Sequence, residues 1–292
     1  MRKIGAHVSA AGGIDKAVER VAAIGGNCLQ LFSGSPRVWA KPGLDKYPMD
    51  KLTAALAKYA VAPVFTHALY LVNVASDKPE NIRKSFECLK YELEFDSLVK
   101  GSGIIVHLGS HQGRGWAASR EQIAMHINNL LEQTPEDSTF LIENSAGQKG
   151  KIASDLAEIR WLLDRAEQSG QWVSKKRLGW CLDTCHAHAA GYKLGDPSKV
   201  VAEEKSIFGE ITQLKLWETL KVVHVNDSRD PFASGRDRHA NIGEGNIPTE
   251  DLRYFVNEKH ITKVPLILEV PGKDKKGPNA ENIQKVIDLV QN

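Results

Sequence analysis

The sequence predicts an α/β fold, a single (β/α)8 TIM barrel in which eight parallel strands alternate with helices. Short apolar runs alternate eight times with longer amphipathic stretches along the 292 residues. Most of the apolar runs are continuous, as expected for parallel strands that are covered on both faces. The sequence contains neither GxGxxG nor GxxxxGK[ST], the glycine-rich motifs of open nucleotide-binding sheets. A closed barrel is therefore preferred to a doubly wound sheet.

The expected strands are short apolar runs, and the expected helices between them carry an apolar stripe. The strands span residues 3–7, 27–32, 62–67, 103–108, 139–143, 178–183, 221–227 and 265–270. The helices span residues 14–24, 50–59, 79–100, 118–133, 154–168, 197–209, 249–257 and 279–291.

Several of the expected helix starts carry capping signals. Ser154 is followed by carboxylates in the first turn, and Thr249 follows Pro248. Asp196 precedes Pro197, which suits the first helical position because proline has no N–H to leave unpaired. These residues favour helix starts near positions 154, 197 and 249.

Two connections are longer than a barrel needs, and long loops on a compact fold are usually functional. They cover residues 33–48 and 228–248. A third segment, 271–278, contains Lys273-Asp-Lys-Lys and is expected to be a solvated loop. No linker divides the chain, so residues 1–292 are expected to form one domain with its functional loops at the C-terminal face of the strands.

Composition places the chain among ordinary globular proteins. Hydrophobic residues make up 42% and charged residues 25%. The net charge of +2 is too close to neutral to indicate nucleic-acid binding by itself. No apolar run approaches the roughly 18 residues of a membrane span, and no secretion signal is recognisable after Met1. We therefore expect a soluble, cytoplasmic protein without a membrane partner.

The four cysteines are dispersed in expected strands and helices, which indicates buried reduced thiols. Cys181 and Cys185 form a CxxxC pair beside Asp183 and His186, a spacing that could ligate zinc. On a strand, however, Cys181 lies one layer deeper than Asp183. Packing is the preferred interpretation for all four, which are Cys28, Cys88, Cys181 and Cys185.

Seven of the eight expected strands carry, at or just before their C-terminal end, a side chain that can bind metal or transfer protons. These residues are His7, His67, His107, Glu143, Asp183, His224 and Glu269. Only the second strand, with Gln30 and Phe32, lacks one. Because the C-terminal strand ends of a barrel converge on one mouth, these groups are expected to meet there.

Carboxylates and imidazoles buried together without cations would be strongly unfavourable, and divalent metal ions are the simplest solution. A mixed His/Asp/Glu set suits zinc, with manganese or iron as alternatives. These ligands are too many for one tetrahedral ion, and His186, Asp237 and His239 add more, although the last two also fit a solvated polar loop. A multinuclear centre suits phosphoester hydrolysis, because it generates a hydroxide and neutralises the leaving oxygen.

Six segments resemble the motifs of the endonuclease IV family of apurinic/apyrimidinic (AP) endonucleases. They are GAHVSAAGG at 5–13, IENSAG at 142–147, CLDTCHA at 181–187 with AGY at 190–192, HVND at 224–227, DRH at 237–239 with GEGNI at 243–247, and LILE at 266–269. The match runs in order along nearly the whole chain. The resemblance implies a (β/α)8 barrel with three zinc ions, with manganese as an alternative at one site.

The resemblance also implies how the ligands are shared. It assigns His67, His107 and Glu143 to one ion, Glu143, Asp183, His224 and Glu269 to a second, and His186, Asp237 and His239 to the third. The bridging Glu143 would be the catalytic residue, through activation of the hydroxide. The family cleaves the DNA phosphodiester 5′ to an abasic site, leaves a 3′-hydroxyl and removes 3′-blocking groups in base excision repair.

The implied partner is double-stranded DNA with abasic sites or blocked 3′ ends, bound by a monomer that is nucleoid-associated in a prokaryote. Arg37, Tyr70 and Leu71 match the positions that enter the base stack. Three residues next to expected ligands differ from the family pattern. None of them is itself an expected ligand, so the differences affect the details of DNA contact and not the chemistry. They are Ala68, Leu69 and Leu108.

Two other functions compete with this interpretation. A metal-dependent sugar isomerase or epimerase of similar barrel fold also uses Glu, Asp and His at strand ends, but it has no evident use for a third metal site. A non-catalytic damaged-DNA-binding module would be expected to lack a ligand, and none is missing from the set above.

Overall fold

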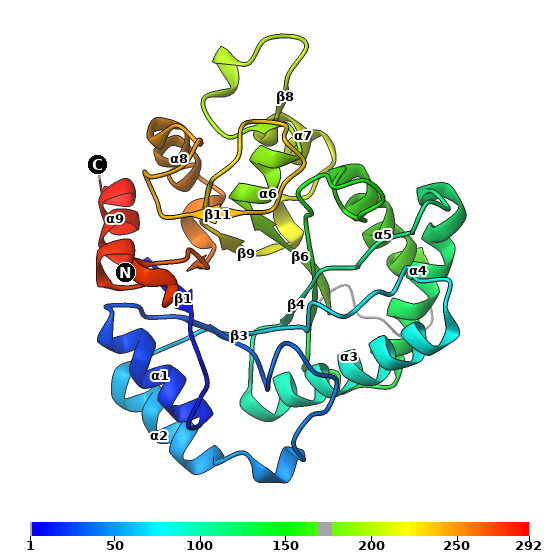
Figure 1. Cartoon of the computed structure of the whole chain (residues 1–292), viewed down its shortest axis with the longest axis vertical. Helices are drawn as coiled ribbons and strands as arrows, with labels where there is room; N and C mark the ends of the chain where they lie inside the picture. The colour runs from blue at the N-terminus through cyan, green and yellow to red at the C-terminus, as the bar shows by residue number, and fades with distance from the viewer. Residues whose placement is uncertain (1, 169–176, 292) are drawn as a thin grey trace.

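The computed structural model describes residues 2–168 and 177–291, which form a closed barrel surrounded by helices (Figure 1). Each neighbouring pair of barrel strands is parallel, and the ring runs in the order β1, β12, β9, β6, β5, β4, β3, β2. The strands are β1 Ile4–His7, β2 Leu29–Leu31, β3 Val64–His67, β4 Ile104–Val106, β5 Phe140–Glu143, β6 Leu178–Asp183, β9 Leu220–His224 and β12 Leu266–Leu268. The predicted TIM barrel is confirmed.

The helices lie outside this ring and bury their apolar faces against it (Figure 1). They are α1 Ile14–Ala23, α2 Met49–Tyr59, α3 Pro79–Val99, α4 Trp116–Glu132, α5 Leu156–Gln168, α6 Thr184–Ala189, α7 Ile207–Gln213, α8 Thr249–Val256 and α9 Ala280–Gln291. Among the described residues, no helix is both long and apolar enough to cross a membrane.

The barrel interior is closed by a layer of side chains from or beside seven of its strands. This layer consists of Cys28, Phe65, Ile105, Leu141, Cys181, Val222 and Ile267. On β1, Gly5 leaves room for the backbone of Cys28, the residue before β2. A Cβ atom at position 5 would lie 1.8 Å from the carbonyl oxygen of Cys28. The packed layer gives the C-terminal mouth of the barrel a dry floor.

All eight expected strands are present, with ends that differ by a few residues. The expected helix at 197–209 is wrong. Residues Pro197–Lys199 form a 3-10 turn, Lys205–Ser206 form the short strand β8 paired with β7 Tyr192–Lys193, and α7 begins only at Ile207. The reason is local: Asp196 caps the 3-10 turn by accepting from Ser198 N, and the hydroxyl of Ser206 starts a new helix by accepting from Gly209 N.

Two other expected caps also differ. The side chain of Asp155, not Ser154, bonds the N–H of Ala157 near the start of α5. At α8 the N-cap residue is Pro248, and no side-chain cap is formed. The long 228–248 connection is ordered by a small hairpin of β10 Asp227–Ser228 and β11 His239–Ala240.

Candidate metal centre

The ends of β3, β4 and β5 bring together the first expected group of ligands. Nε2 of His67 and Nε2 of His107 each lie 3.2 Å from Oε2 of Glu143. Nδ1 of His67 donates to the carbonyl oxygen of Ala68 at 2.8 Å. Its Nε2 is therefore the unprotonated nitrogen of the neutral ring, as a metal ligand must be.

The second group uses the other oxygen of the same carboxylate. Nδ1 of His224 lies 3.0 Å from Oε1 of Glu143, 3.2 Å from Oε2 of Glu269 and 3.7 Å from Oδ2 of Asp183. Glu143, Asp183 and His224 have no exposed surface. Glu143 thus lies between the two groups and offers one oxygen to each.

The third group joins α6 to the loop after β9. Nε2 of His186 lies 3.0 Å, and Nε2 of His239 3.4 Å, from Oδ1 of Asp237. The members of this group also lie near other side chains that can bind metal. His186 and His239 lie near Asp183, and Asp237 and His239 lie near Cys185. Both imidazoles nevertheless contact the Asp237 carboxylate, and the centroids of their rings are 5.5 Å apart.

The spacing of these donor atoms fits metal ions. In a tetrahedral zinc site with bonds of about 2.0–2.1 Å, neighbouring ligand atoms are separated by roughly 3.3 Å. The measured separations of 3.0–3.7 Å lie around that value. In addition, the buried Nε2 atoms of His186 and His239 make no hydrogen bond of acceptable geometry with the described residues. The residues present therefore suit bound divalent cations.

Electrostatics at the cluster are dominated by burial and by the proximity of opposite charges. Burial alone would raise the pKa of the Glu143 carboxyl, but His107 and His224 outweigh it and hold the pKa well below its usual range. Burial lowers the pKa of His107 to about 4. For His186, burial is outweighed by Asp183 and Asp237, and the pKa rises to about 10.

Sequence reasoning missed Gln30, at the end of the one strand thought to lack a functional group. Its Nε2 donates to Oε1 of Glu269 at 2.6 Å, and its Oε1 lies 2.7 Å from Nε2 of His224. His7, on the neighbouring β1, also lies against this carboxylate, with Nδ1 3.0 Å from Oε1 of Glu269. Gln30 pairs with His7 in the register of β1 and β2, and this pairing becomes visible only in the structure.

The two cysteines beside the cluster are buried and free. Cys181 belongs to the apolar layer that closes the barrel, where burial raises the pKa of its thiol to about 12. Its sulfur also lies near Glu143 and His224. The place of Cys181 in the apolar layer agrees with the packing role expected from the sequence.

The loop that carries Asp237 and His239 is held in place by Asp227. Oδ1 of Asp227 accepts from the N–H groups of Ser228 and Ile247, and Oδ2 accepts from those of Gly243 and Gly245. The distances are 2.7–3.0 Å, and Asp227 is fully buried. One carboxylate therefore fixes both ends of the loop.

An ion pair orders the tip of the same loop. Arg238, which stands between Asp237 and His239, donates through Nε to Oδ2 of Asp230 at 2.7 Å and through Nη2 to Oδ1. A bidentate contact of this kind fixes the direction of a guanidinium as well as its position. It therefore restrains the chain between Asp237 and His239, the two side chains that face the candidate metal centre.

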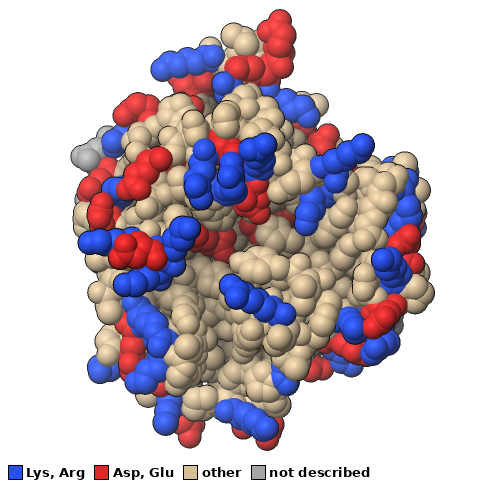
Figure 2. All heavy atoms as spheres, in the orientation of Figure 1, with Lys and Arg blue, Asp and Glu red and all other residues tan. Residues whose placement is uncertain are grey.

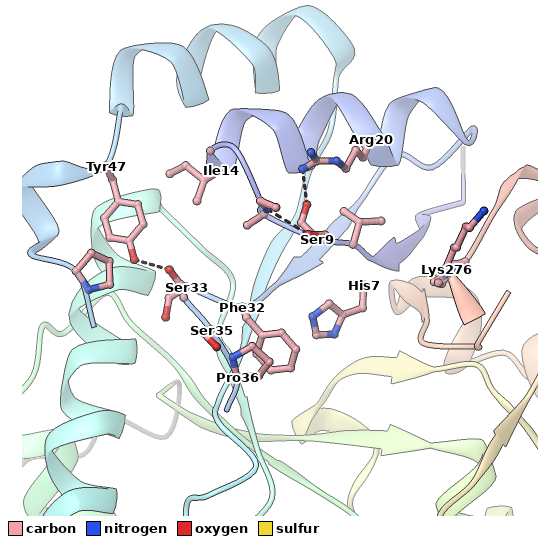
Figure 3. A pocket seen from close by; sticks show the side chains of 18 of the residues that line it. His7, Ser9, Ile14, Arg20, Phe32, Ser33, Ser35, Pro36, Tyr47 and Lys276 are labelled. Atoms are coloured by element: carbon pink, nitrogen blue, oxygen red, sulfur yellow. Dashed lines mark hydrogen bonds between the residues drawn. The ribbon is translucent and has the colours of Figure 1, made fainter. Parts of the chain in front are cut away.

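A groove of about 1310 Å³ runs beside the cluster. Its walls are the loops that follow β1 and β2 together with residues 275–278, as Figure 3 shows for His7, Phe32, Pro36 and Lys276. The cluster itself opens into a smaller pocket of about 350 Å³. Figure 2 shows acidic atoms at the bottom of a central hollow and Lys and Arg side chains spaced around it. A polyanion could therefore approach the rim.

The expected DNA-contacting residues lie around these openings. Arg37 is exposed in the wall of the groove. Tyr70 and Leu71 are 63% and 43% exposed beside the cluster, with the Tyr70 ring packed against Phe32 and His67 at centroid distances of 5.5 and 5.7 Å. The three departures from the family pattern, in contrast, are buried: Ala68, Leu69 and Leu108.

The loop that carries Arg37 is anchored to α3 by a buried ion pair. Nζ of Lys41 contacts Oε1 of Glu92 and donates to Oγ of Ser33 at 2.9 Å. The Lys41 side chain is 7% exposed and that of Glu92 is fully buried. The hydroxyl of Tyr47 donates to the carbonyl oxygen of Ser33 beside this pair (Figure 3). Both ends of the loop are thus tied to the barrel.

Comparison with known proteins gives consistent results. Residues 18–292 match the family of xylose isomerase-like TIM barrels. A protein of Haloarcula marismortui called probable endonuclease 4 is 35% identical over 289 residues, which cover 99% of each chain. The crystal structure of endonuclease IV from Thermus thermophilus is 30% identical, covers 98% of each chain and superposes with a TM-score of 0.82.

A sugar epimerase shares the fold but little sequence. The crystal structure of 3-keto-D-glucoside 4-epimerase from E. coli has a TM-score of 0.66 and 14% identity, and covers 99% of each chain. At that identity the likeness shows the fold alone.

Replacing Asp227 with Asn is expected to lower the metal content by about one ion per chain. The new amide nitrogen would face two N–H donors, at a cost of about 1–3 kcal/mol, and would release the loop that carries Asp237 and His239. The measurement is metal per chain by mass spectrometry after gel filtration. Glu244→Gln, in the same loop but bonded to Asn241 and Lys285, is the control. Unchanged metal content in Asp227→Asn would contradict the anchoring role.

Proposed function

The chain belongs to the endonuclease IV family of AP endonucleases, which are phosphodiester hydrolases, and from this premise we propose its reaction. It hydrolyses the DNA phosphodiester 5′ to an abasic site, leaves a 3′-hydroxyl and removes blocking groups from 3′ ends. Three zinc ions would serve the reaction, held by the ligand sets that the family resemblance implies.

The observation that best supports this proposal is the position of Glu143. Its two oxygens face two different sets of imidazoles and carboxylates, at 3.0–3.2 Å from the nearest nitrogens. A carboxylate placed in this way suits a bridge between two cations, and the group of His186, Asp237 and His239 adds a third position beside it. When bound, such cations act as Lewis acids that activate water and neutralise charge on a phosphate.

The protein side chains contribute orientation and exclusion of water. Nδ1 of His186 donates to the carbonyl oxygen of Asn144, and Nδ1 of His239 lies 3.4 Å from that of Glu269, so each ring presents Nε2 toward the cluster. The packed barrel layer keeps bulk water from entering below. In this dry setting the interactions of the carboxylates are stronger than they would be in water.

DNA binding follows from the surface around the cluster. Arg37 lines the groove, and Tyr70, next to the exposed Leu71, lines the pocket of the cluster. An exposed cation can neutralise a phosphate, and an exposed aromatic ring can replace a base in the stack when the abasic nucleotide turns out of the helix. The partner proposed is therefore damaged double-stranded DNA.

Removal of metal is expected to abolish incision. Incubation with a duplex carrying one abasic site should give a single cut 5′ to that site. A chelator should prevent the cut, and added zinc should restore it, because the ligand groups need cations to act. The products are resolved on a denaturing gel beside an undamaged duplex. Cutting at full rate in excess chelator would contradict the proposal.

The Glu143→Gln variant should lose incision by at least about 10²–10³-fold, the scale of removing a principal electrostatic group from an active site. The neutral amide can no longer place an anionic oxygen in both groups. Glu87→Gln is the matched control, since that carboxylate is 61% exposed on α3, where it pairs with Arg83. Rates are measured under single turnover with excess enzyme. An unchanged rate in Glu143→Gln would exclude it from catalysis.

Replacing Arg37 with Ala should weaken binding of abasic duplex by about tenfold while the metal content stays the same, because one phosphate or base contact is worth roughly 1–3 kcal/mol. Affinity is measured by fluorescence anisotropy at fixed salt. Arg83→Ala removes an equal charge from exposed surface on α3 and serves as the control. Equal affinity in both variants would remove Arg37 from the interface.

A further inference from the structure

We infer that Gln30 is a positioning residue of the metal centre, which selects the ring nitrogen that His224 offers and the carboxylate oxygen that Glu269 offers. This role rests on the proposed function, since it concerns the second ligand group. It concerns a residue that is neither a proposed ligand nor a DNA contact.

Gln30 lies in β2 and is completely buried. Its partners in the ring are His7 on β1 and Phe65 on β3. Its amide is an uncharged group surrounded by the imidazoles and the carboxylate of the cluster. A buried amide at such a position must have its hydrogen bonds satisfied by its neighbours.

The neighbours fix the orientation of the amide. Nε2 lies 2.6 Å from Oε1 of Glu269, and Oε1 lies 2.7 Å from Nε2 of His224. In the flipped orientation, the amide oxygen would face a carboxylate oxygen, and neither atom could donate. The amide nitrogen must therefore face Glu269, and the amide oxygen must face His224.

This orientation determines the state of His224. The amide oxygen can only accept, so Nε2 of His224 carries the hydrogen. In the neutral ring, Nδ1 is then unprotonated, and this is the atom that faces Oε1 of Glu143 at 3.0 Å and Oε2 of Glu269 at 3.2 Å. A metal-binding imidazole requires this arrangement, with the distal N–H held by an acceptor.

The distal nitrogen of His224 is held by a side chain, whereas those of other imidazoles in the cluster are held by the backbone. The distal nitrogens of His67 and His186 are held by the carbonyl oxygens of Ala68 and Asn144. No substitution removes a carbonyl oxygen. The orientation of His224, in contrast, can be changed by altering Gln30 alone.

The same amide also determines which carboxylate oxygen of Glu269 faces His224. Gln30 and His7 both contact Oε1, which leaves Oε2 on the side of His224. One glutamine therefore orients two members of a single ligand group, the imidazole through its oxygen and the carboxylate through its nitrogen. A carboxylate at position 30 would repel Glu269, and an apolar side chain would leave Nε2 of His224 without its acceptor and Oε1 of Glu269 with His7 alone.

The test is the Gln30→Met variant, which keeps the size of the side chain and removes both polar atoms. Its affinity for one of its zinc ions should fall about 10–100-fold, the range for loss of a hydrogen bond to a ligand. Affinity is measured by competition with a chromophoric chelator. The visible absorption of the cobalt-substituted protein should change as well, because it reports ligand geometry.

The Gln122→Met variant is the matched control. Gln122 is an amide in α4 whose Nε2 donates to the carbonyl oxygen of Ser76 at 2.8 Å and whose Oε1 accepts from Arg114 at 3.0 Å. The same chemical change there should leave zinc affinity and the cobalt spectrum as in the unmodified protein. Equal zinc affinity and spectra in Gln30→Met and the unmodified protein would overturn the inference.

A second measurement needs no variant and covers the case in which Gln30→Met does not fold. Long-range proton–nitrogen spectra of the zinc-loaded protein, labelled at histidine, should place a proton on Nε2 of His224 and none on Nδ1. The reverse assignment would overturn the inference. Incision of abasic DNA is followed on the same unmodified sample, and failure to bind zinc or to cut would instead reject the proposed function.

Discussion

The structure of this site depends on one buried carboxylate, Glu143, which is shared by two sets of imidazoles. A carboxylate without exposed surface is tolerated only where opposite charges or metal ions surround it. The parallel barrel provides those surroundings, because each strand ends at the same mouth and contributes one polar group above an apolar floor. The fold therefore concentrates carboxylate oxygens and imidazole nitrogens at spacings of 3.0–3.7 Å, which isolated strand ends could not maintain.

Polar contacts help to hold the elements around the mouth. Asp227 accepts hydrogen bonds from four backbone N–H groups of the loop after β9. The ion pair of Lys41 and Glu92 connects the loop after β2 to α3. Gln30 performs a related role inside the ring, where it orders His224 and Glu269. The candidate ligand groups are thus fixed by their neighbours, an arrangement that suits metal binding.

Much of this organisation is readable from the sequence, for reasons that differ by residue. The strands were predicted because buried parallel strands are continuous apolar runs, and His67, His107 and Glu143 because each ends such a run. The helix predicted at 197–209 was wrong because Ser206 caps a later helix and short strands form before it, which periodicity cannot detect. Gln30 was missed because a glutamine at a strand end has no metal-binding signature. Its meaning depends on the register that places it beside His7 and on the closed ring that brings His224 within contact of its side chain.

The buried contact between Lys41 and Glu92 has a consequence for how this chain can vary. Removal of one partner from a buried pair typically costs about 3–5 kcal/mol, whereas replacement of both by apolar residues is often neutral. The two residues are 51 positions apart in the chain, one in a loop that forms the groove and one in a helix outside its walls. Exchange of the groove loop between related proteins should therefore succeed only when position 92 is exchanged with it, so that the loop and α3 form a single evolutionary unit.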